Sequence, residues 1–165
     1  MRDDGGSDLA STGGAWTARG GRWVVGQITL LLAAAATAPA WGGQWHNPAA
    51  RATGLALLGL GAVSGLAGMI NLGRSLTPFP RPREASNLVR HGIYRWVRHP
   101  LYGSLIATSA GWALVWSSLP GLLVAAVLAV FLNAKADHEE NWLRRRYPEY
   151  AAYAARVKKL VPFIY

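Results

Sequence analysis

Two short stretches of the sequence combine charged and aromatic side chains that could bind a charged ligand. The first, residues 92–103, contains two arginines, one histidine and two tyrosines, and the second is Asp137-His138-Glu139-Glu140. A carboxylate can pair with an ammonium group, and the faces of tyrosine rings attract cations. Pro100 suits the first position of a helix, and the free N–H groups of a helix start favour an anion. Nearly all of the concentrated polar chemistry of the chain lies in these two stretches, and the apolar segment between them is expected to fold back and bring them together.

Four apolar segments surround these stretches and predict an all-α integral membrane protein. About 20 apolar residues cross a bilayer as a helix. The chain is 52% hydrophobic and 15% charged, whereas a typical soluble domain has about 25% charged residues. A chain of 165 residues is too small to cover several such helices in a soluble protein. The expected transmembrane helices are residues 23–41, 52–72, 101–116 and 121–136.

The third and fourth of these helices are expected to form an antiparallel hairpin. Residues 117–121, Ser-Ser-Leu-Pro-Gly, interrupt the apolar sequence, and proline and glycine disfavour a continuous helix. The turn has no charged residue, whereas both outer ends of the hairpin carry many. A hairpin therefore brings residues 92–103 and residues 137–140 to the same side of the membrane.

The positive charges predict the orientation in the membrane. The net charge is +9, and the loop of residues 73–100 contains six arginines but a single acid, Glu84. Because these charges lie between apolar blocks, they indicate a membrane protein and not a nucleic-acid-binding protein. Lysine and arginine prefer the cytoplasmic side, so both termini and the 73–100 loop are expected there. The alanine- and glycine-rich composition is typical of a bacterial source, which makes the inner membrane the expected location.

The remaining segments complete a single expected membrane domain, residues 23–165. Residues 1–22 are expected to be a flexible polar tail, and residues 137–159 an amphipathic helix on the membrane surface. Gly61 and Gly65 have the spacing that lets two helices approach closely in lipid. We expect them to pack against another helix of the same chain.

The residues that begin the hairpin also resemble a known family. Gly92, Tyr94, Arg98, His99, Pro100 and Tyr102, followed by the hairpin and by two glutamates, are similar to the isoprenylcysteine carboxyl methyltransferase and phospholipid methyltransferase superfamily. The resemblance covers about residues 71–165. It implies S-adenosylmethionine as methyl donor and a lipophilic acceptor reached from the bilayer. By position, it implies a cofactor-binding set of Ser86, Asn87, Leu88, Val89, Tyr94, His99, Pro100, Leu101, Tyr102 and Glu139.

The same resemblance implies residues for the acceptor and for the transfer. Lys135 stands where the family has an arginine near the acceptor, a change that keeps the charge but loses the planar guanidinium. Arg98, His99 and Glu140 are the candidate catalytic residues. A carboxylate acceptor is already ionised and needs no base, whereas an amine or hydroxyl would need Glu140 or His138. The expected acceptor is the carboxylate of a small isoprenoid or another lipid.

Two other functions fit parts of the sequence. Membrane reductases of the sterol-reductase type have a similar end, like Pro162-Phe163-Ile164-Tyr165 here, and would use NADPH. They usually show Arg-His-x-Asn-Tyr where this chain has Arg98-His99-Pro100-Leu101-Tyr102. A non-catalytic membrane protein with the same fold is the second alternative. Binding of S-adenosylhomocysteine or of NADPH distinguishes these functions.

Several residues have a simpler interpretation than a role in catalysis. The loop arginines Arg81, Arg83 and Arg95 equally fit contacts with lipid headgroups, and Glu139 and Glu140 fit an exposed helix start. The tyrosines of the C-terminal helix are typical of interfacial anchors. The chain has no cysteine, and its histidines and acids match no usual ligand spacing, so no metal site is expected.

Overall fold

The computed structural model describes residues 20–77, 79 and 88–165, and within them the chain forms five α-helices. Two short 3-10 helices, η1 (Gly73–Ser75) and η2 (Gly92–Arg95), lie between α3 and α4. The described residues contain no β-sheet, only one isolated bridge between Val97 and Lys158. The all-α prediction is therefore confirmed. The α-helices are α2 (Gly21–Ala40), α3 (Pro48–Leu72), α4 (Pro100–Val115), α5 (Leu119–Arg146) and α6 (Tyr150–Arg156).

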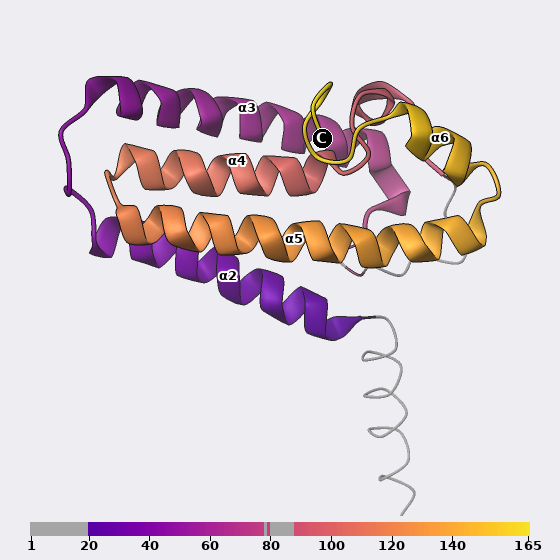
Figure 1. Ribbon diagram of the computed structural model, residues 1–165, viewed down its shortest axis with the longest axis horizontal. Helices are drawn as coiled ribbons and strands as arrows, with labels where there is room; N and C mark the ends of the chain where they lie inside the picture. Colours follow the sequence, from indigo (N-terminus) through magenta and orange to yellow (C-terminus); the bar gives the residue numbers. More distant parts are fainter. Residues whose placement is uncertain (1–19, 78, 80–87) are drawn as a thin grey trace, which may run out of the picture.

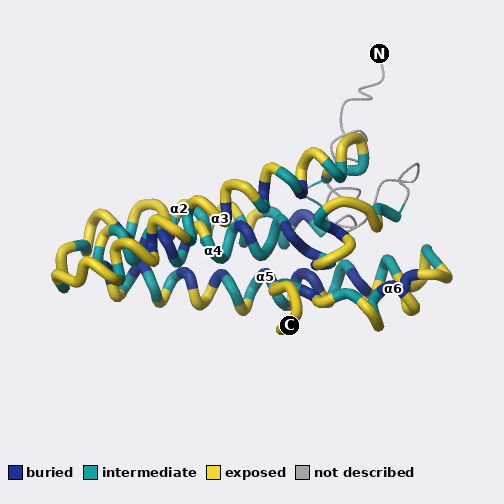
Figure 2. Tube along the Cα trace, turned by 90° about the horizontal axis from the view of Figure 1, so that it is seen from above, coloured by how far each residue is buried: buried dark blue, intermediate teal, exposed yellow. Residues whose placement is uncertain are grey.

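Three of the helices are long and apolar enough to cross a membrane: α2, α3 together with η1, and α5. Their large apolar side chains point outward, as lipid-facing residues do, and Figure 2 shows exposed residues along the outer faces of the bundle. Leu60, Val63 and Val130 are 66%, 70% and 73% exposed. The chain is an integral membrane protein. α4, with 16 residues, is shorter than these three and lies between α3 and α5 (Figure 1).

α3 and α4 approach closely because glycines line the face of α3 that meets α4. Gly54, Gly61, Gly65 and Gly68 are its buried residues. A Cβ atom on Gly65 would lie 2.9 Å from the hydroxyl of Ser104 in α4, so a larger residue would force the helices apart. The prediction that the glycine pair packs within the chain is confirmed.

The hairpin between α4 and α5 forms as predicted. Ser117 has a positive φ of 52°, which reverses the chain, and the side chain of Ser118 accepts a hydrogen bond from the backbone N–H of Gly121 (3.1 Å). This bond satisfies one of the free N–H groups at the start of α5. Pro120 lies in the first turn of α5, where its missing backbone N–H would have had no partner within the helix. The start of α4 and the outer part of α5 therefore lie at the same end of the molecule (Figure 1).

The C-terminal region differs from the expected helix of residues 137–159. α5 continues without interruption to Arg146, so the fourth expected transmembrane helix and the first part of that surface helix are one element. The helix stops at Tyr147 (φ −118°, ψ 106°) because Pro148 disfavours a helical conformation in the residue before it. After this break the short helix α6 returns toward the start of α4 (Figure 1).

Candidate active site

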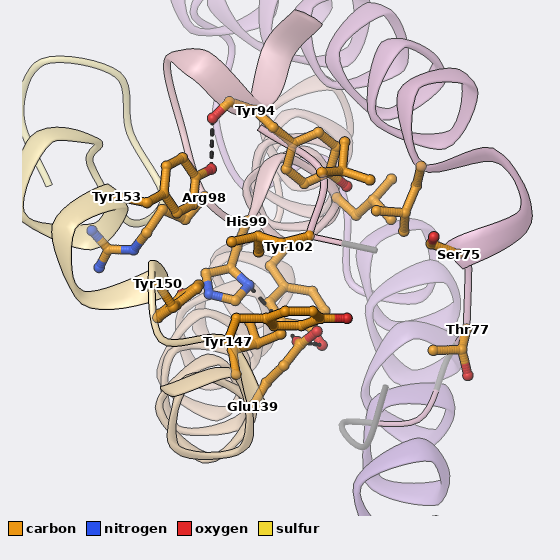
Figure 3. Close-up of a pocket in the computed structure, with 15 residues that line it drawn as sticks. Ser75, Thr77, Tyr94, Arg98, His99, Tyr102, Glu139, Tyr147, Tyr150 and Tyr153 are labelled. Carbon is orange, nitrogen blue, oxygen red and sulfur yellow. Dashed lines mark hydrogen bonds and ion pairs between the residues drawn. The ribbon is translucent and has the colours of Figure 1, made fainter. Parts of the chain in front are cut away.

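A cavity lies where α4 begins and α5 extends beyond it, and α6 forms one of its walls. Figure 3 shows His99, Tyr147 and Glu139 close together, with Ser75 and Thr77 on the opposite side. Eight residues of the predicted site line the cavity: Leu88, Val89, Tyr94, His99, Leu101, Tyr102, Glu139 and Arg98. All but Arg98 are predicted cofactor-binding residues, and Arg98 and His99 are candidate catalytic residues. Pro100 is buried as the first residue of α4, and Ser86 and Asn87 lie outside the described residues.

The hairpin brings the first turn of α4 against Glu139 of α5. The hydroxyl of Tyr102 donates a 2.9 Å hydrogen bond to Oε2 of Glu139, and Nδ1 of His99 lies 3.8 Å from the same oxygen. The rings of His99 and Tyr102 are parallel, with centroids 5.4 Å apart. The two polar stretches of the sequence therefore meet, and a carboxylate, an imidazole and a phenol face one cavity.

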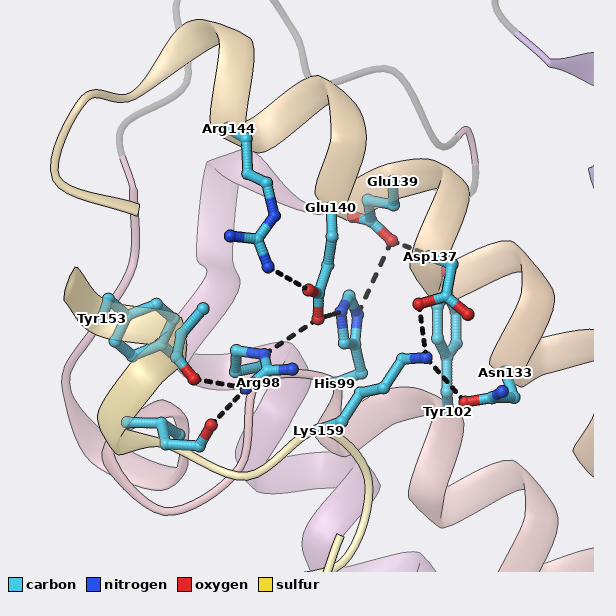
Figure 4. A network of polar contacts seen from close by, with 12 residues as sticks. Arg98, His99, Tyr102, Asn133, Asp137, Glu139, Glu140, Arg144, Tyr153 and Lys159 are labelled. Atoms are coloured by element: carbon cyan, nitrogen blue, oxygen red, sulfur yellow. Dashed lines mark hydrogen bonds and ion pairs between the residues drawn. The ribbon is translucent and has the colours of Figure 1, made fainter. Parts of the chain in front are cut away.

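Glu140 has a different environment from its neighbour. Its side chain is 7% exposed and its Oε1 accepts a 2.8 Å hydrogen bond from Nε of Arg98. Nε2 of His99 lies 3.1 Å from the same oxygen, and Arg144 approaches Oε2 at 3.4 Å (Figure 4). Within the described part of the chain, Glu139 lines the cavity but Glu140 does not. Glu140 therefore contacts Arg98 and His99, which line the cavity, without lining the cavity itself.

The guanidinium group of Arg98 connects the segment before α4 to α5 and to the end of α6. Besides Glu140, it donates to the backbone carbonyls of Ala154 (2.9 Å) and Val157 at the end of α6. These bonds satisfy carbonyl groups that the end of a helix leaves free. Arg98 therefore fixes α6 against α5, although part of its side chain also lines the cavity.

The C-terminal segment pairs with the chain just before α4. The backbone N–H groups of Arg98 and His99 donate to the carbonyls of Lys158 (2.8 Å) and Lys159 (3.0 Å). The buried ammonium of Lys159 donates to Asp137 (2.7 Å). The sequence did not predict this pairing, because it joins residues about 60 positions apart and follows no periodic pattern.

Three tyrosines that were expected as interfacial anchors, Tyr147, Tyr150 and Tyr153, line the cavity instead. The hydroxyl of Tyr153 donates a 2.6 Å hydrogen bond to the carbonyl of Tyr94, and burial raises the pKa of Tyr153 to about 12. The hydroxyl of Tyr150 is buried and has no hydrogen-bond partner among the described residues. Burial raises the pKa of Tyr94 and Tyr150 above the usual tyrosine range, so these phenols are neutral. The spacing of three residues between the tyrosines places them near one another on a helix, and this was the signal that could have identified them as cavity residues.

Lys135 lies one turn of α5 before Glu139, outside the cavity lining. It is 1% exposed, and its Nζ donates a 2.6 Å hydrogen bond to Oε1 of Gln27 in α2. The same ammonium lies 5.4 Å from the ring centroid of Tyr102. His138, a candidate base, instead stacks on Trp23 of α2, with ring centroids 5.6 Å apart. No group of three metal-binding side chains occurs in residues 20–77, 79 and 88–165.

A sequence model of the phospholipid methyltransferase family matches residues 49–150 of this chain. The chain belongs to the phospholipid methyltransferase family. The matched region contains α3 apart from its first residue, all of α4 and α5, and most of the cavity lining. α2, the C-terminal segment and all of α6 but its first residue lie outside it.

Three plant proteins are similar to this member of the phospholipid methyltransferase family. Protein-S-isoprenylcysteine O-methyltransferases B and A of Arabidopsis thaliana are each 30% identical to it over 115 residues, which are 67% of this chain and 58% of each relative. A probable protein-S-isoprenylcysteine O-methyltransferase of Oryza sativa subsp. indica has the same identity over 115 residues, 60% of its length. The chain thus covers about three fifths of the length of these relatives.

Proposed function

We propose that this protein transfers a methyl group from S-adenosylmethionine to a lipophilic acceptor at the membrane surface. The observation that carries the proposal is the cavity in which His99, Tyr102 and Glu139 meet at the polar end of an apolar helical bundle. The family supports methyl transfer, and the names of the plant relatives supply the acceptor class, an S-isoprenylcysteine, and an oxygen atom as the position of methylation.

The residues that line the cavity fit the chemical groups of S-adenosylmethionine. The carboxylate of Glu139 suits the ammonium group, and the start of α4 beside His99 suits the carboxylate, because free N–H groups there favour an anion. The faces of Tyr94 and Tyr102 suit the sulfonium cation. The buried hydroxyl of Tyr150, which lacks a partner among the described residues, is a further polar group of this wall. When bound, S-adenosylmethionine supplies an activated methyl group.

Other predicted binding residues complete this assignment. Leu88 and Val89 line the cavity from the loop before η2 and suit the apolar parts of the cofactor. Ser86 and Asn87 are retained as proposed cofactor-binding residues on the resemblance alone, since they lie outside the described residues.

We further propose a carboxylate as the acceptor group. Glu140 is held by Arg98 and His99 and is therefore poorly suited to accept a proton from an amine or a hydroxyl. A carboxylate is already ionised, so its methylation needs no base. The chain then acts by positioning and by excluding water, contributions that reach about 7–11 kcal/mol in well-oriented reactions. The acceptor is an isoprenoid-like or other lipid acid that enters from the bilayer. Lys135 is the proposed substrate residue, whose positive charge attracts the carboxylate of the acceptor.

The proposed arrangement has four transmembrane helices with both termini in the cytoplasm. The 16 residues of α4 span about 24 Å at 1.5 Å per residue, slightly less than the roughly 30 Å of a bilayer core. α4 contacts α3, α5 and α2, and these longer helices shield it from lipid where it falls short. Both polar stretches then face the cytoplasm, where S-adenosylmethionine is dissolved.

Binding of S-adenosylhomocysteine to the purified protein tests the cofactor assignment. Isothermal titration calorimetry should show binding to the wild type, and His99→Ala and Glu139→Ala should each weaken it roughly tenfold to a hundredfold, because each loses an interaction with a charged group worth about 1.5–3 kcal/mol. Glu149→Ala, at an exposed glutamate outside the cavity lining, is the control. Unchanged affinity in both cavity variants would refute the assignment, and binding of NADPH instead would support the reductase alternative.

The acceptor is identified in a second experiment. Lipid extracts incubated with the protein and isotopically labelled S-adenosylmethionine should yield a labelled methyl ester by mass spectrometry. Label in an amine or an ether would contradict the carboxylate assignment while leaving methyl transfer intact.

A further inference from the structure

A second hollow, which we call the arginine hollow, lies beside the candidate active site. Its lining residues are Arg90, Arg95, Tyr153, Arg156 and Val157. Its volume is about 320 Å³, and it shares only Tyr153 with the cavity described above. Arg90 precedes η2, whereas Arg95 and Arg156 are the last residues of η2 and α6. The arginine hollow therefore lies between the loop that leads into α4 and the helix that returns to it.

The positive charges of the arginine hollow are not balanced by acids in the part of the chain that the structure describes. The lining described there includes no carboxylate, and none of the ion pairs between described residues involves Arg90, Arg95 or Arg156. All three side chains are exposed, so an ion can reach them. Three guanidinium groups around one space repel one another, and an anion bound between them lowers the electrostatic energy.

The guanidinium groups can donate hydrogen bonds into this space. Nε of Arg156 donates to the carbonyl of Ala152 in its own helix (3.2 Å), which leaves the terminal nitrogens of Arg156 for an acceptor from outside. The guanidinium of Arg95 lies over the ring of Trp96, 4.8 Å from the centroid, and stacking on a ring leaves the N–H groups at the guanidinium edge able to donate. Because a planar guanidinium donates two parallel hydrogen bonds to phosphate oxygens, the arginine hollow suits a phosphate group.

Apolar side chains beside the arginine hollow indicate that it faces the surface of the membrane. Trp96, which lies under Arg95, is exposed and packs against Phe163 with ring centroids 5.4 Å apart. Phe163 is itself 76% exposed, and Ile164 is exposed next to it. Exposed aromatic side chains next to arginines are typical of the headgroup level of a bilayer, where apolar groups enter the lipid and cations stay at the polar surface. The anion nearest to such a surface is a lipid headgroup.

From these observations we propose that the arginine hollow binds the phosphate of an anionic membrane phospholipid. A zwitterionic phospholipid carries the same phosphate, but the arginines repel its ammonium group. The bound phosphate joins η2 to the end of α6, and these elements contribute Tyr94 and Tyr153 to the wall of the neighbouring cavity. Binding of the lipid therefore stabilises that wall. The proposal does not depend on the methyl transfer proposed above.

Titration of phosphatidylglycerol into the full-length protein in a neutral detergent tests the proposal, with bound lipid measured by native mass spectrometry. Arg90→Gln/Arg156→Gln should raise the Kd of the first bound phosphatidylglycerol roughly tenfold to thirtyfold, since each arginine near an anionic lipid contributes about fivefold. Arg22→Gln/Arg145→Gln is the matched control. It removes the same charge from exposed arginines outside the arginine hollow and should change the Kd less than threefold.

The melting temperature gives a second measurement. Phosphatidylglycerol should raise it in the wild type and in the control, because a ligand of the folded state stabilises that state, and should raise it much less in Arg90→Gln/Arg156→Gln. Arg90→Lys/Arg156→Lys keeps the charges but loses the planar guanidinium, so its Kd should lie between those of the wild type and the glutamine variant. This variant also keeps the test available if the glutamine variant does not fold.

Three outcomes would overturn the proposal. Equal Kd values for Arg90→Gln/Arg156→Gln and the control would show that the lipid responds to net charge alone. Equal affinity of the wild type for phosphatidylcholine with the same acyl chains would show that the headgroup charge is not recognised. Displacement of the lipid by inorganic phosphate, at a concentration equal to that of the lipid, would identify a soluble anion as the ligand in place of a membrane lipid.

Discussion

Tyr102 and Glu139 form a 2.9 Å hydrogen bond across the hairpin, from the first turn of α4 to the outer part of α5. Because the tyrosine donates, it orients the carboxylate in the wall of the cavity. Tyr102→Phe should lower the affinity for S-adenosylhomocysteine about threefold to tenfold, less than Glu139→Ala, since the charge of Glu139 remains. Calorimetry on both variants checks this order. Tyr165→Phe removes a hydroxyl that is bonded to Asn133 outside the cavity lining, and should bind as the wild type does.

The Arg98–Glu140 pair predicts a large effect on stability. The two side chains are 13% and 7% exposed and 2.8 Å apart. Removing one partner of a buried pair leaves the other charge uncompensated, which costs about 3–5 kcal/mol. Arg98→Gln should therefore lower the melting temperature markedly and loosen α6, whose end carbonyls Arg98 also binds.

Arg95 provides the control for this substitution. It lies three residues earlier, is exposed, and its guanidinium rests over the ring of Trp96 at 4.8 Å. Arg95→Gln removes the same charge and should change the melting temperature little. Equal losses in the two variants would mean that net charge, and not the Arg98–Glu140 pair, determines the stability of this end of the molecule.

The buried hydroxyl of Tyr153 predicts a loss of stability at alkaline pH. Burial is the main cause that raises its pKa to about 12, whereas the pKa of an unfolded tyrosine is about 10. Below pH 10 both states keep the proton. Between pH 10 and 12 the unfolded chain loses it while the folded chain keeps it, so the free energy of unfolding falls with rising pH, by up to about 2.7 kcal/mol.

Denaturation at pH 8, 10 and 11.5 measures this slope. Tyr153→Phe should be less stable than the wild type at pH 8, because it loses the hydrogen bond to Tyr94, but should lose less stability between pH 10 and 11.5. A variant with the same slope as the wild type would show that other groups account for the alkaline instability.

Two glycines of α3 provide a matched test of the packing against α4. A Cβ atom on Gly61 would collide with the hydroxyl of Thr108 and lie 3.0 Å from the carbonyl of Ser104, whereas nothing lies within 4 Å of the corresponding position on Gly59. Gly61→Ala should therefore lower the melting temperature in detergent. Gly59→Ala should leave it unchanged or raise it, because alanine is favoured over glycine in a helix by about 1 kcal/mol. The same effect in both variants would contradict close α3–α4 packing.

The parts of the fold that follow local rules were predictable from the sequence. The turn at Ser117–Gly121 and the long apolar runs identify the hairpin, and the hairpin alone brings His99 and Glu139 together. Only the family resemblance gave the two adjacent glutamates different roles. Local rules do not distinguish them, because neighbouring residues of a helix point about 100° apart and the packing decides which one faces the cavity. The position of α6 was likewise not predictable from local rules, because the direction of the chain after Pro148 depends on tertiary contacts with Arg98.

Contacts between distant residues were the least predictable part of the site. Gln27 and Lys135 are separated by 108 positions, and neither residue type alone indicates the other. Buried polar residues in an apolar helix nevertheless need partners, so Gln27 in α2 and Lys135 in α5 could have been paired by elimination. The pairing of Arg98 and His99 with Lys158 and Lys159 uses backbone groups, which carry no signal of side-chain type.

The last prediction concerns the orientation of the hairpin turn. The chain has no cysteine, so a single introduced cysteine reports the side of the membrane on which it lies. Ser118 is unsuitable because it is 0% exposed and caps α5, whereas Leu119 is 54% exposed. In intact cells, a membrane-impermeant maleimide should label Leu119→Cys from outside the cytoplasm. Arg145→Cys, at an exposed residue near the other end of α5, should react only after permeabilisation. The reverse pattern would place the cavity outside the cytoplasm, away from the S-adenosylmethionine dissolved there, and would contradict both the orientation and the proposed function.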